Sequence, residues 1–143
     1  MTKFPLKEIK ELQNEILKNN KIFSVCKFKI KNLTQFEIIK YLYDNRNKEV
    51  IQKEFEEILN IRKSTISGIL DTMEKNNIII RVHDSNKRGK HIRLTDEIIK
   101  EMNKIIKEFE SVEKSIIEGI SDKDLEVFYN VINKMKHNLK KGE

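Results

Sequence analysis

Apolar residues in the middle of the chain follow first a helical and then a strand-like spacing. Phe55, Ile58 and Leu59 predict a helix over residues 52–60, because they recur at the three- and four-residue steps of one helix face. A second helix is predicted by the same spacing of Ile66, Ile69, Leu70 and Met73. A tight turn at residues 60–62 joins the two, and together they predict a helix-turn-helix.

The face of the second helix opposite its apolar stripe carries mostly small, hydroxyl-bearing side chains. This surface, with Lys63 at its start, consists of Ser64, Gly68, Asp71 and Thr72, and is flanked by Thr65 and Ser67. Small side chains let a helix lie deep in the major groove of DNA, where hydroxyls can bond base edges or phosphates. An ordinary solvated helix face is the alternative, which this helix taken alone does not exclude.

Two alternating segments follow and predict a β-hairpin. After a left-handed helix stop expected at Asn76-Asn77, residues 78–83 and 90–94 alternate apolar and polar side chains. The residues expected to face the core are Ile80, Val82, Ile92 and Leu94. The residues expected to face outward are Arg81, His83, His91 and Arg93. Residues 84–89, at the tip, are rich in turn formers.

The hairpin is strongly basic. From Arg81 to Arg93 there are five Lys or Arg residues against one Asp. Lys87, Arg88 and Lys90 are therefore placed to neutralise DNA phosphates and to insert an arginine into an adjacent minor groove. An edge hairpin kept soluble by its charge is the alternative, but it does not explain why the charge directly follows a helix-turn-helix.

Several short motifs run through this central stretch in a fixed order. They are QKEF at 52–55, LNI at 59–61, KSTIS at 63–67, LD at 70–71, MEK at 73–75, IIIR at 78–81, KRG at 87–89 and LT at 94–95. This pattern resembles the multiple antibiotic resistance regulator (MarR) family. The resemblance implies a winged-helix homodimer that binds a pseudo-palindromic operator in double-stranded DNA, usually as a repressor released by a small ligand or by thiol oxidation. The DNA-contacting positions that it carries over are Lys63, Ser64, Thr65, Ser67 and Arg88.

Three positions depart from the family pattern. Arg62 stands where the family often has a Ser or Thr that caps the second helix of the helix-turn-helix, here called the reading helix. Loss of such a cap typically lowers helix stability by about 1 kcal/mol. Gly68 stands where the family commonly has Arg or another long side chain, and Asn86 replaces an Asp that would hold Arg88. These differences affect the expected operator sequence and the affinity for DNA more than they affect the predicted class of protein.

The two ends of the chain are predicted to form dimerisation helices. Pro5 suits a first helical turn, and Ile9, Leu12 and Ile16 follow at helical spacing. Past the hairpin, Thr95 is the expected cap of a helix with a coiled-coil seam formed by Ile98, Met102, Ile105, Phe109, Val112 and Ile116. After a break at residues 119–124, with Ser121 as cap, the seam continues with Leu125, Phe128, Ile132, Met135 and Leu139. A second subunit is the economical partner for these seams, and an intramolecular helical pair is the alternative.

The predicted fold class is mainly α with a small β-hairpin wing, a winged helix-turn-helix with flanking dimerisation helices. Residues 1–143 are expected to form a single domain. Within it, residues 34–95 form the DNA-binding region, and residues 1–31 and 96–143 form the helical dimerisation region. The 143 residues and 38% hydrophobic content suit one such domain, and the net charge of +6 fits a polyanionic partner. Because the sequence shows no signal peptide or membrane-length apolar run, a cytoplasmic location and no membrane partner are expected.

Residues 25–34 fit two interpretations. Cys26, Phe28 and Ile30 alternate with lysines as in a strand, whereas the family resemblance makes this segment the end of the first helix, and we follow the resemblance. Residues 34–37 are then expected to form a capping box, with Thr34 as cap, at the start of the next helix. The resemblance also suggests a pocket for a small aromatic ligand, with the aromatic candidates Phe28, Phe36 and Tyr43.

Other chemistry finds little support in the sequence. The lone Cys26 excludes an intrachain disulfide, and His83, His91 and His137 lack the spacing of a zinc site, although the first two could face each other across the hairpin. Nearby lysines could make Cys26 an oxidation sensor, but a free cysteine is more often a small buried hydrophobe. No enzymatic activity, cofactor or metal is expected. A winged helix that binds an acidic protein remains the alternative to a DNA-binding regulator.

Overall fold

The computed structural model describes residues 4–19, 28, 30–83 and 90–142. It divides into two compact units, Met1–Phe109 and Glu110–Glu143.

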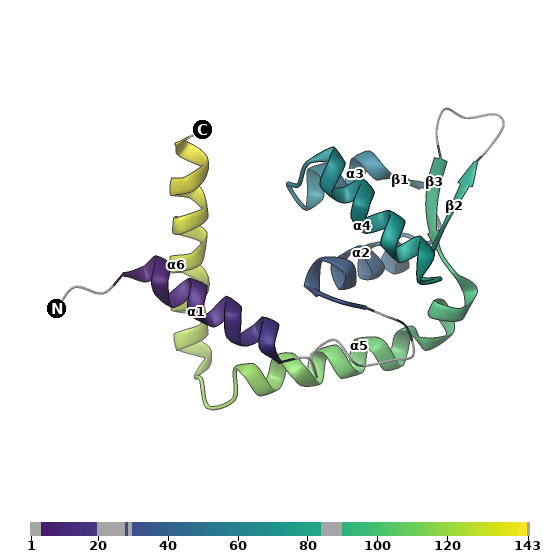
Figure 1. Ribbon diagram of the computed structural model, residues 1–143. Helices are drawn as coiled ribbons and strands as arrows, with labels where there is room; N and C mark the ends of the chain where they lie inside the picture. Colours follow the sequence, from purple (N-terminus) through teal and green to yellow (C-terminus); the bar gives the residue numbers. More distant parts are fainter. Residues whose placement is uncertain (1–3, 20–27, 29, 84–89, 143) are drawn as a thin grey trace. The chain divides into compact units, whose positions relative to one another are not determined.

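The first unit contains a helix-turn-helix, further helices and a small sheet (Figure 1). Its helices are α1 (Pro5–Lys18), α2 (Leu33–Asp44), α3 (Gln52–Ile58), α4 (Lys63–Lys75) and the start of α5 (Asp96–Ile116). The predicted helices at residues 52–60 and around 64–73 are thereby confirmed as α3 and α4. Asn60, in the turn between them, has a φ of 51°, a left-handed conformation that Asn tolerates better than most residues.

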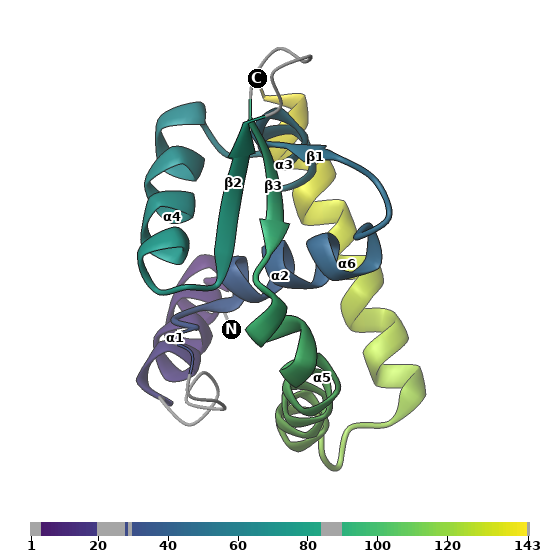
Figure 2. The same cartoon turned by 90° about the vertical axis from the view of Figure 1, so that its right-hand side faces the viewer.

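The predicted hairpin is confirmed and is part of a three-stranded antiparallel sheet. The strands are β1 (Val50–Ile51), β2 (Ile79–His83) and β3 (Lys90–Leu94), in the spatial order β1-β3-β2. Figure 2 shows β2 and β3 side by side, with α4 next to β2. The fold class predicted from the sequence is therefore correct.

The core of the first unit combines the predicted apolar faces of the helices with one face of the sheet. Phe55, Ile66, Leu70 and Met73 are all fully buried. Ile58, assigned to the same stripe as Phe55, is instead 51% exposed, because α3 ends there. Burial of each large apolar side chain contributes roughly 1.5–3 kcal/mol to folding, so this cluster fixes the positions of α3 and α4.

The predicted facing of β2 is wrong by one residue. Ile79 is fully buried, whereas Ile80 is 39% exposed. Directly paired residues of neighbouring strands share a face, and Ile79 pairs with Leu94 while Arg81 pairs with Ile92. Arg81 therefore lies on the face of the buried residues, and Ile80 and Val82 lie on the other.

Three helix boundaries agree with the signals predicted from the sequence. Asn77 ends α4 with a φ of 61°. The Thr95 hydroxyl accepts a hydrogen bond from the Ile98 amide at 3.4 Å at the start of α5. The Ser121 hydroxyl accepts one from the Asp124 amide at 3.1 Å at the start of α6. Short-range capping chemistry thus decides where these helices begin and end.

The segment before α2 differs from the prediction. Helix α1 ends at Lys18, and residues 28 and 30–32 are neither helix nor strand, so these described residues of the segment are not the end of the first helix. The cap of α2 is Asn32, whose side-chain oxygen accepts a hydrogen bond from the Gln35 amide at 3.0 Å. Thr34 already lies inside the helix, so it is not the cap. Gln35 in turn accepts from the Lys31 amide at 3.0 Å.

Part of the predicted α5 seam belongs to the core of the first unit. Met102 and Ile105 are 0% and 2% exposed within a single chain, and Ile98 is also fully buried. Phe109 stacks on Phe36 of α2, with ring centroids 3.8 Å apart. Met102 and Ile105 are therefore not free to contact a second subunit, which corrects their assignment as dimerisation residues.

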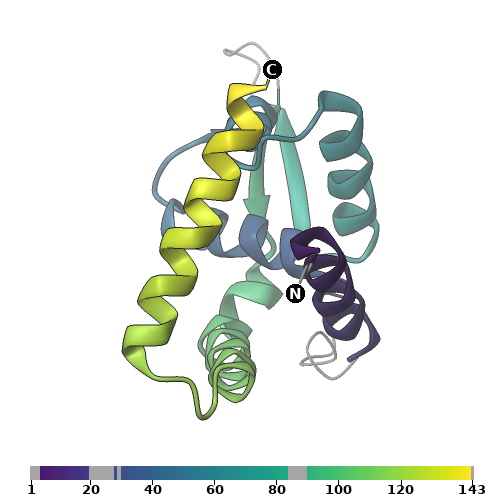
Figure 3. The ribbon, with the colours of Figure 1, turned by 90° about the vertical axis from the view of Figure 1, so that its left-hand side faces the viewer.

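The second unit contains the end of α5 and helix α6 (Asp122–Lys141) (Figure 3). No residue of α6 is buried within the chain. Its exposed apolar residues include Val127, Phe128, Tyr129, Val131 and Leu139. Across the described residues, no helix is long and apolar enough to cross a membrane.

Candidate nucleic-acid interface

The face of α4 that was predicted to contact DNA bases, here called the reading face, is exposed to solvent. The buried side of α4 holds Ile66, Leu70 and Met73, and the residues on its opposite side are exposed or half-buried. The exposed ones are Lys63, Ser64, Thr65, Gly68 and Asp71, and the half-buried ones are Ser67 and Thr72. The DNA-binding candidates of α4 thus lie on one solvent-facing side of the helix. Their contact with DNA bases stays a prediction.

The hydroxyls of this face are not equivalent. Thr72 donates a hydrogen bond from its hydroxyl to the Gly68 carbonyl at 3.1 Å, one turn earlier in the same helix. A hydroxyl bonded back to its own helix offers less to an outside partner. Ser64 and Thr65, which are exposed at the start of the helix, are therefore the better candidates for base contacts.

Gly68 leaves a bare strip of backbone in the middle of the exposed face. A Cβ built at this position would meet no atom within 4 Å. Gly68 also lies outside the left-handed region, so the backbone conformation does not demand glycine. Glycine within a helix costs about 0.5–1 kcal/mol relative to alanine. No internal contact among the described residues accounts for this cost.

The start of α4 lacks a side-chain cap, as the departure at Arg62 predicts. Arg62 occupies the N-cap position, and its side chain makes no capping hydrogen bond. The first amides of a helix have no acceptor within the helix itself. These donors are consequently available to a group outside the helix.

Arg81 joins the hairpin to the reading helix. Its Nη1 atom donates to Asp71 at 2.7 Å and to Glu74 at 3.3 Å, and both carboxylates belong to α4. Only 15% of the Arg81 side chain is exposed. Arg81 was expected to face outward, and this is wrong: it positions α4 against β2. The sequence did not reveal this role because the pairing depends on the register of β2.

A basic concavity lies between α3, the start of α4 and the strands. Its volume is about 590 Å³, and it is lined by Ile51, Gln52, Lys53, Glu56, Lys63, Arg81, Lys90 and Ile92. Lys63 and Lys90 were predicted from the sequence as DNA contacts, whereas Lys53 was not. Its position in the first turn of α3, before the aromatic residue Phe55, carried no distinguishing signal.

The wing is described only at its base. Lys90 is exposed at the first position of β3, whereas Lys87 and Arg88 lie outside the described residues. His83 pairs with Lys90 and His91 pairs with Val82, so the two histidines are not opposite each other. Adjacent register positions point to opposite faces of a sheet. In the described part of the chain, no cluster of His, Cys, Asp and Glu could hold a metal ion.

A polar cluster holds α3 against α2. Glu54 accepts hydrogen bonds from the Tyr41 hydroxyl at 2.9 Å, from Lys48 at 3.0 Å and from the Ile51 amide at 2.8 Å. Burial alone would raise the pKa of Glu54, but the hydrogen bonds from Ile51, Lys48 and Tyr41 outweigh it, so the pKa lies below its usual value. The same contact with Glu54 raises the pKa of Lys48.

The end of α4 is tied to the start of α5. The Thr95 hydroxyl donates to the Asn77 carbonyl at 2.9 Å, and the Thr95 amide donates to the Ile78 carbonyl at 3.1 Å. The Asn77 side-chain amide also donates to the Glu97 carboxylate. We name these residues, Asn77, Thr95 and Glu97, the α4–α5 clasp. They fix the reading helix to the helix that leads out of the first unit.

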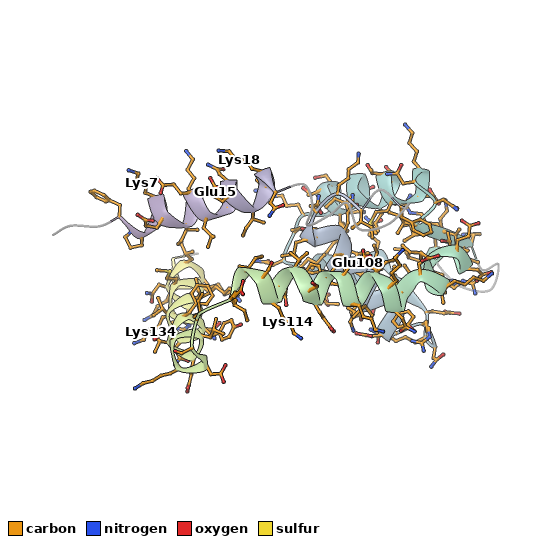
Figure 4. All side chains as sticks on the ribbon, turned by 90° about the horizontal axis from the view of Figure 1, so that it is seen from below. Lys7, Glu15, Lys18, Glu108, Lys114 and Lys134 are labelled. Carbon is orange, nitrogen blue, oxygen red and sulfur yellow. The ribbon has the colours of Figure 1, made fainter. Side chains whose placement is uncertain are left out.

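The remaining dimerisation candidates lie on surfaces of separate elements. On α1, Ile9 and Leu12 are 43% and 51% exposed and Ile16 is half-buried. Lys7, Glu15 and Lys18, labelled in Figure 4, belong to its i,i+4 and i,i+3 ion pairs Lys7–Glu11 and Lys18–Glu15. In the C-terminal part, Phe128 is 47% exposed, and the half-buried candidates are Val112, Ile132 and Met135.

The aromatic candidates for a ligand pocket do not form an open site. Phe28 and Phe36 are part of the buried core, and Phe36 is covered by the ring of Phe109. Tyr43 is half-buried, and the guanidinium of Arg46 lies 4.3 Å from the centre of its ring. Cys26 lies outside the described residues, so its role as a redox sensor stays a prediction.

A helix-turn-helix followed by a β-hairpin beside its second helix defines a winged-helix protein of the DNA-binding class. Residues 31–90 match the model of the MarR family. The central part of the chain, which holds the helix-turn-helix and most of the sheet, is therefore similar to this family of transcription regulators.

Solved structures extend the likeness over nearly the whole chain. The transcription regulator MarR from Oenococcus oeni PSU-1 is 26% identical, with a TM-score of 0.69 over 92% of this chain and 97% of that one. The heme sensor protein PefR from Streptococcus agalactiae, solved with heme, is 24% identical, with a TM-score of 0.70 over 96% and 95%. MepR from S. aureus, solved with DNA, is 21% identical, with a TM-score of 0.78 over 95% and 96%. The last two likenesses concern the fold.

Proposed function

We propose that this chain is a sequence-specific DNA-binding transcriptional regulator that acts as a homodimeric repressor on a pseudo-palindromic operator. The observation that carries the proposal is the exposed, hydroxyl-bearing face of α4 beside a basic hairpin, within the segment that matches the family. The DNA complex of MepR, which shares this fold, supports it. The proposed location is the cytoplasm, where a chromosomal operator is reached.

Exposed apolar residues on the terminal helices support the homodimer. On α1, Leu6 is 78% exposed and Leu12 is 51% exposed, and on α6, Val127 and Leu139 are 54% and 74% exposed. Exposed apolar surface that recurs along two helices is characteristic of an interface. A second copy of the chain is the partner that a two-fold symmetric operator requires.

Selection of bound duplexes from a random pool, followed by footprinting, tests the proposal. We expect an inverted repeat whose half-sites lie about one helical turn apart, because each subunit places one α4 in the major groove on the same side of the DNA. Equal affinity for random duplexes, or protection of a single half-site, would contradict it. A winged helix that binds an acidic protein would show salt-sensitive binding to DNA without any sequence preference.

We also propose that a small aromatic ligand controls operator binding. The match of residues 31–90 to the MarR family model and the existence of a heme sensor with this fold support such control. Because Phe28 and Phe36 are packed, a ligand at the predicted position has to displace the Phe36–Phe109 stack. A screen of small aromatic acids by fluorescence anisotropy with the selected operator is the test. If no compound lowers the affinity, the regulator is not controlled by this class of ligand.

A further inference from the structure

The basic concavity gathers cations from three separate elements of the first unit. Lys53 comes from the first turn of α3, Lys63 from the first position of α4, and Lys90 from the first position of β3. All three residues are exposed. The helix-turn-helix and the strand β3 thus place three lysines around one hollow of about 590 Å³.

These lysines have no anionic partner among the residues that the structure describes. Within the described part of the chain, none of the three takes part in an ion pair. Arg81 also lines the concavity, but its guanidinium is held by Asp71 and Glu74. Like charges that share a concave surface repel one another, and an anion bound between them relieves this repulsion. Glu56 is the acidic residue among those that line the hollow.

We propose that this concavity binds one phosphate group of the DNA backbone, with Lys53, Lys63 and Lys90 as its cationic ligands. The proposal rests on the proposed function and assigns to α3 a direct role in binding DNA. Lys63 belongs both to the concavity and to the reading face of α4. A strand whose bases are read by Ser64 and Thr65 therefore carries its backbone toward the hollow. Lys63 is also the first residue of α4, a helix whose N-cap residue makes no side-chain capping hydrogen bond to the first N–H groups.

The proposal also assigns an opposing effect to Glu56. Glu56 lines the same hollow as the three lysines, so a phosphate bound there would share the hollow with a negative charge. Repulsion between two anions weakens binding without any dependence on base sequence. Glu56 would thus keep affinity for all DNA, including non-operator DNA, below the maximum that the lysines allow.

The test compares the full-length protein with single variants, using the selected operator and a random duplex at several salt concentrations. Lys53→Gln and Lys90→Gln are expected to weaken binding to both duplexes by the same factor. Each is also expected to reduce the slope of log K against log salt by roughly one. Glu56→Gln is expected to strengthen binding to both duplexes. Lys100→Gln, on the exposed side of α5, makes the same change in charge away from the concavity and serves as the matched control.

The outcomes of this experiment distinguish a backbone phosphate contact from a base contact and from a free phosphate ligand. A Lys53→Gln slope equal to that of the Lys100→Gln control would overturn the proposal, because no phosphate contact would have been lost. A changed preference among operator sequences would overturn it too, because it would indicate a base contact. Competition by millimolar inorganic phosphate that Lys53→Gln abolishes would instead assign the hollow to a free phosphate ligand. Absence of operator preference in the unaltered protein would contradict the proposed function, whereas the random-duplex slopes test the concavity independently.

Discussion

At the scale of single residues, Gly68 is the position where stability and DNA binding should conflict. Gly68→Ala adds a methyl group into open space and favours the helix, so we expect the free energy of unfolding to rise by about 0.5–1 kcal/mol. The same methyl group protrudes from the reading face, so we expect operator affinity to fall. Urea unfolding and operator binding of one variant measure both effects.

The matched control for this prediction is Ser111→Ala, a substitution at an exposed helical position of the second unit. It should leave operator affinity unchanged. A Gly68→Ala protein that is more stable and binds the operator as well as before would show that the DNA does not approach the bare backbone of α4.

Glu54 should make the stability of the first unit depend on pH. Its pKa in the folded protein is lowered, so its contribution to stability is fully present above the pKa of the unfolded chain, about 4.3. This contribution is lost as the pH falls through the lower folded pKa. Glu54→Gln keeps the shape of the side chain but cannot ionise. We expect the variant to be less stable than the natural protein at pH 7 and the difference to shrink toward pH 3.

Chemical unfolding at both pH values measures this difference. Glu57→Gln, at an exposed position of the same helix, is the control and should show little change at either pH. A Glu54→Gln deficit that is equally large at pH 3 would mean that packing, and not the charge of Glu54, is responsible.

Capping residues could be predicted from the sequence because capping depends on atoms only a few positions apart. Asn77, Thr95 and Ser121 were identified in this way. The start of α2 was misplaced because Asn32 and Thr34 are both good caps, and local chemistry alone does not choose between them. The side-chain partners of Glu54, Tyr41 and Lys48, come from α2 and from the loop after it, so no local pattern indicated this cluster.

At the scale of elements, the contact between β2 and α4 should affect both stability and DNA binding. Arg81→Gln removes the ion pairs with Asp71 and Glu74, both of which are partly exposed. Such pairs contribute little each, so we expect a loss of about 1 kcal/mol. We expect the loss of operator affinity to be larger than this stability change predicts, because α4 is less firmly oriented.

Arg93→Gln is the matched control, since Arg93 is exposed on the neighbouring strand. A double-mutant cycle of Arg81→Gln with Asp71→Asn measures the coupling directly. Additive effects of the two substitutions would show that the pair does not hold the helix in place.

The hairpin was predictable as an element, but the facing of its first strand was not. Three consecutive isoleucines, Ile78 to Ile80, are compatible with either register of an alternating strand. In the observed register Ile79 is buried and Arg81 lies on the same side, where it pairs with Asp71 and Glu74 of α4. Strand β1 has only two residues and exists through its pairing with β3, so its own sequence carried no signal.

At the scale of the whole molecule, the dimer can be tested on α6 without disturbing the winged helix. Phe128 lies in the second unit and is 47% exposed. If α6 is a subunit contact, Phe128→Glu places a charge in an apolar interface, so we expect a shift from dimer to monomer and loss of operator binding. Sedimentation velocity and circular dichroism together measure the assembly and the folding.

Asn133→Glu introduces the same charge at an exposed polar position of α6 and should leave the dimer intact. A Phe128→Glu protein that remains dimeric would place the subunit contact elsewhere. Ile105→Glu would be a poor test, because Ile105 is buried in the first unit and the substitution would unfold the protein.

The α5 seam shows what an apolar repeat alone cannot decide. Steps of four and three indicate that one side of a helix is covered, but they do not say by what. Met102 and Ile105 are covered by the core of their own chain. Further along, the same rhythm continues into α6, where no residue is buried within the chain. One periodic pattern therefore spans two different environments.

Because the α4–α5 clasp joins the two helices, a movement of the beginning of α5 also moves the reading helix α4. Asn77, Thr95 and Glu97 join the end of α4 to the first turn of α5. From Asp96 to Phe109, α5 extends for about 20 Å at 1.5 Å per residue. A tilt of roughly 5° over that length displaces one end by about 2 Å, more than half of the 3.4 Å rise of one base-pair step. A small change in the angle of α5 would thus move α4 out of register with an operator half-site.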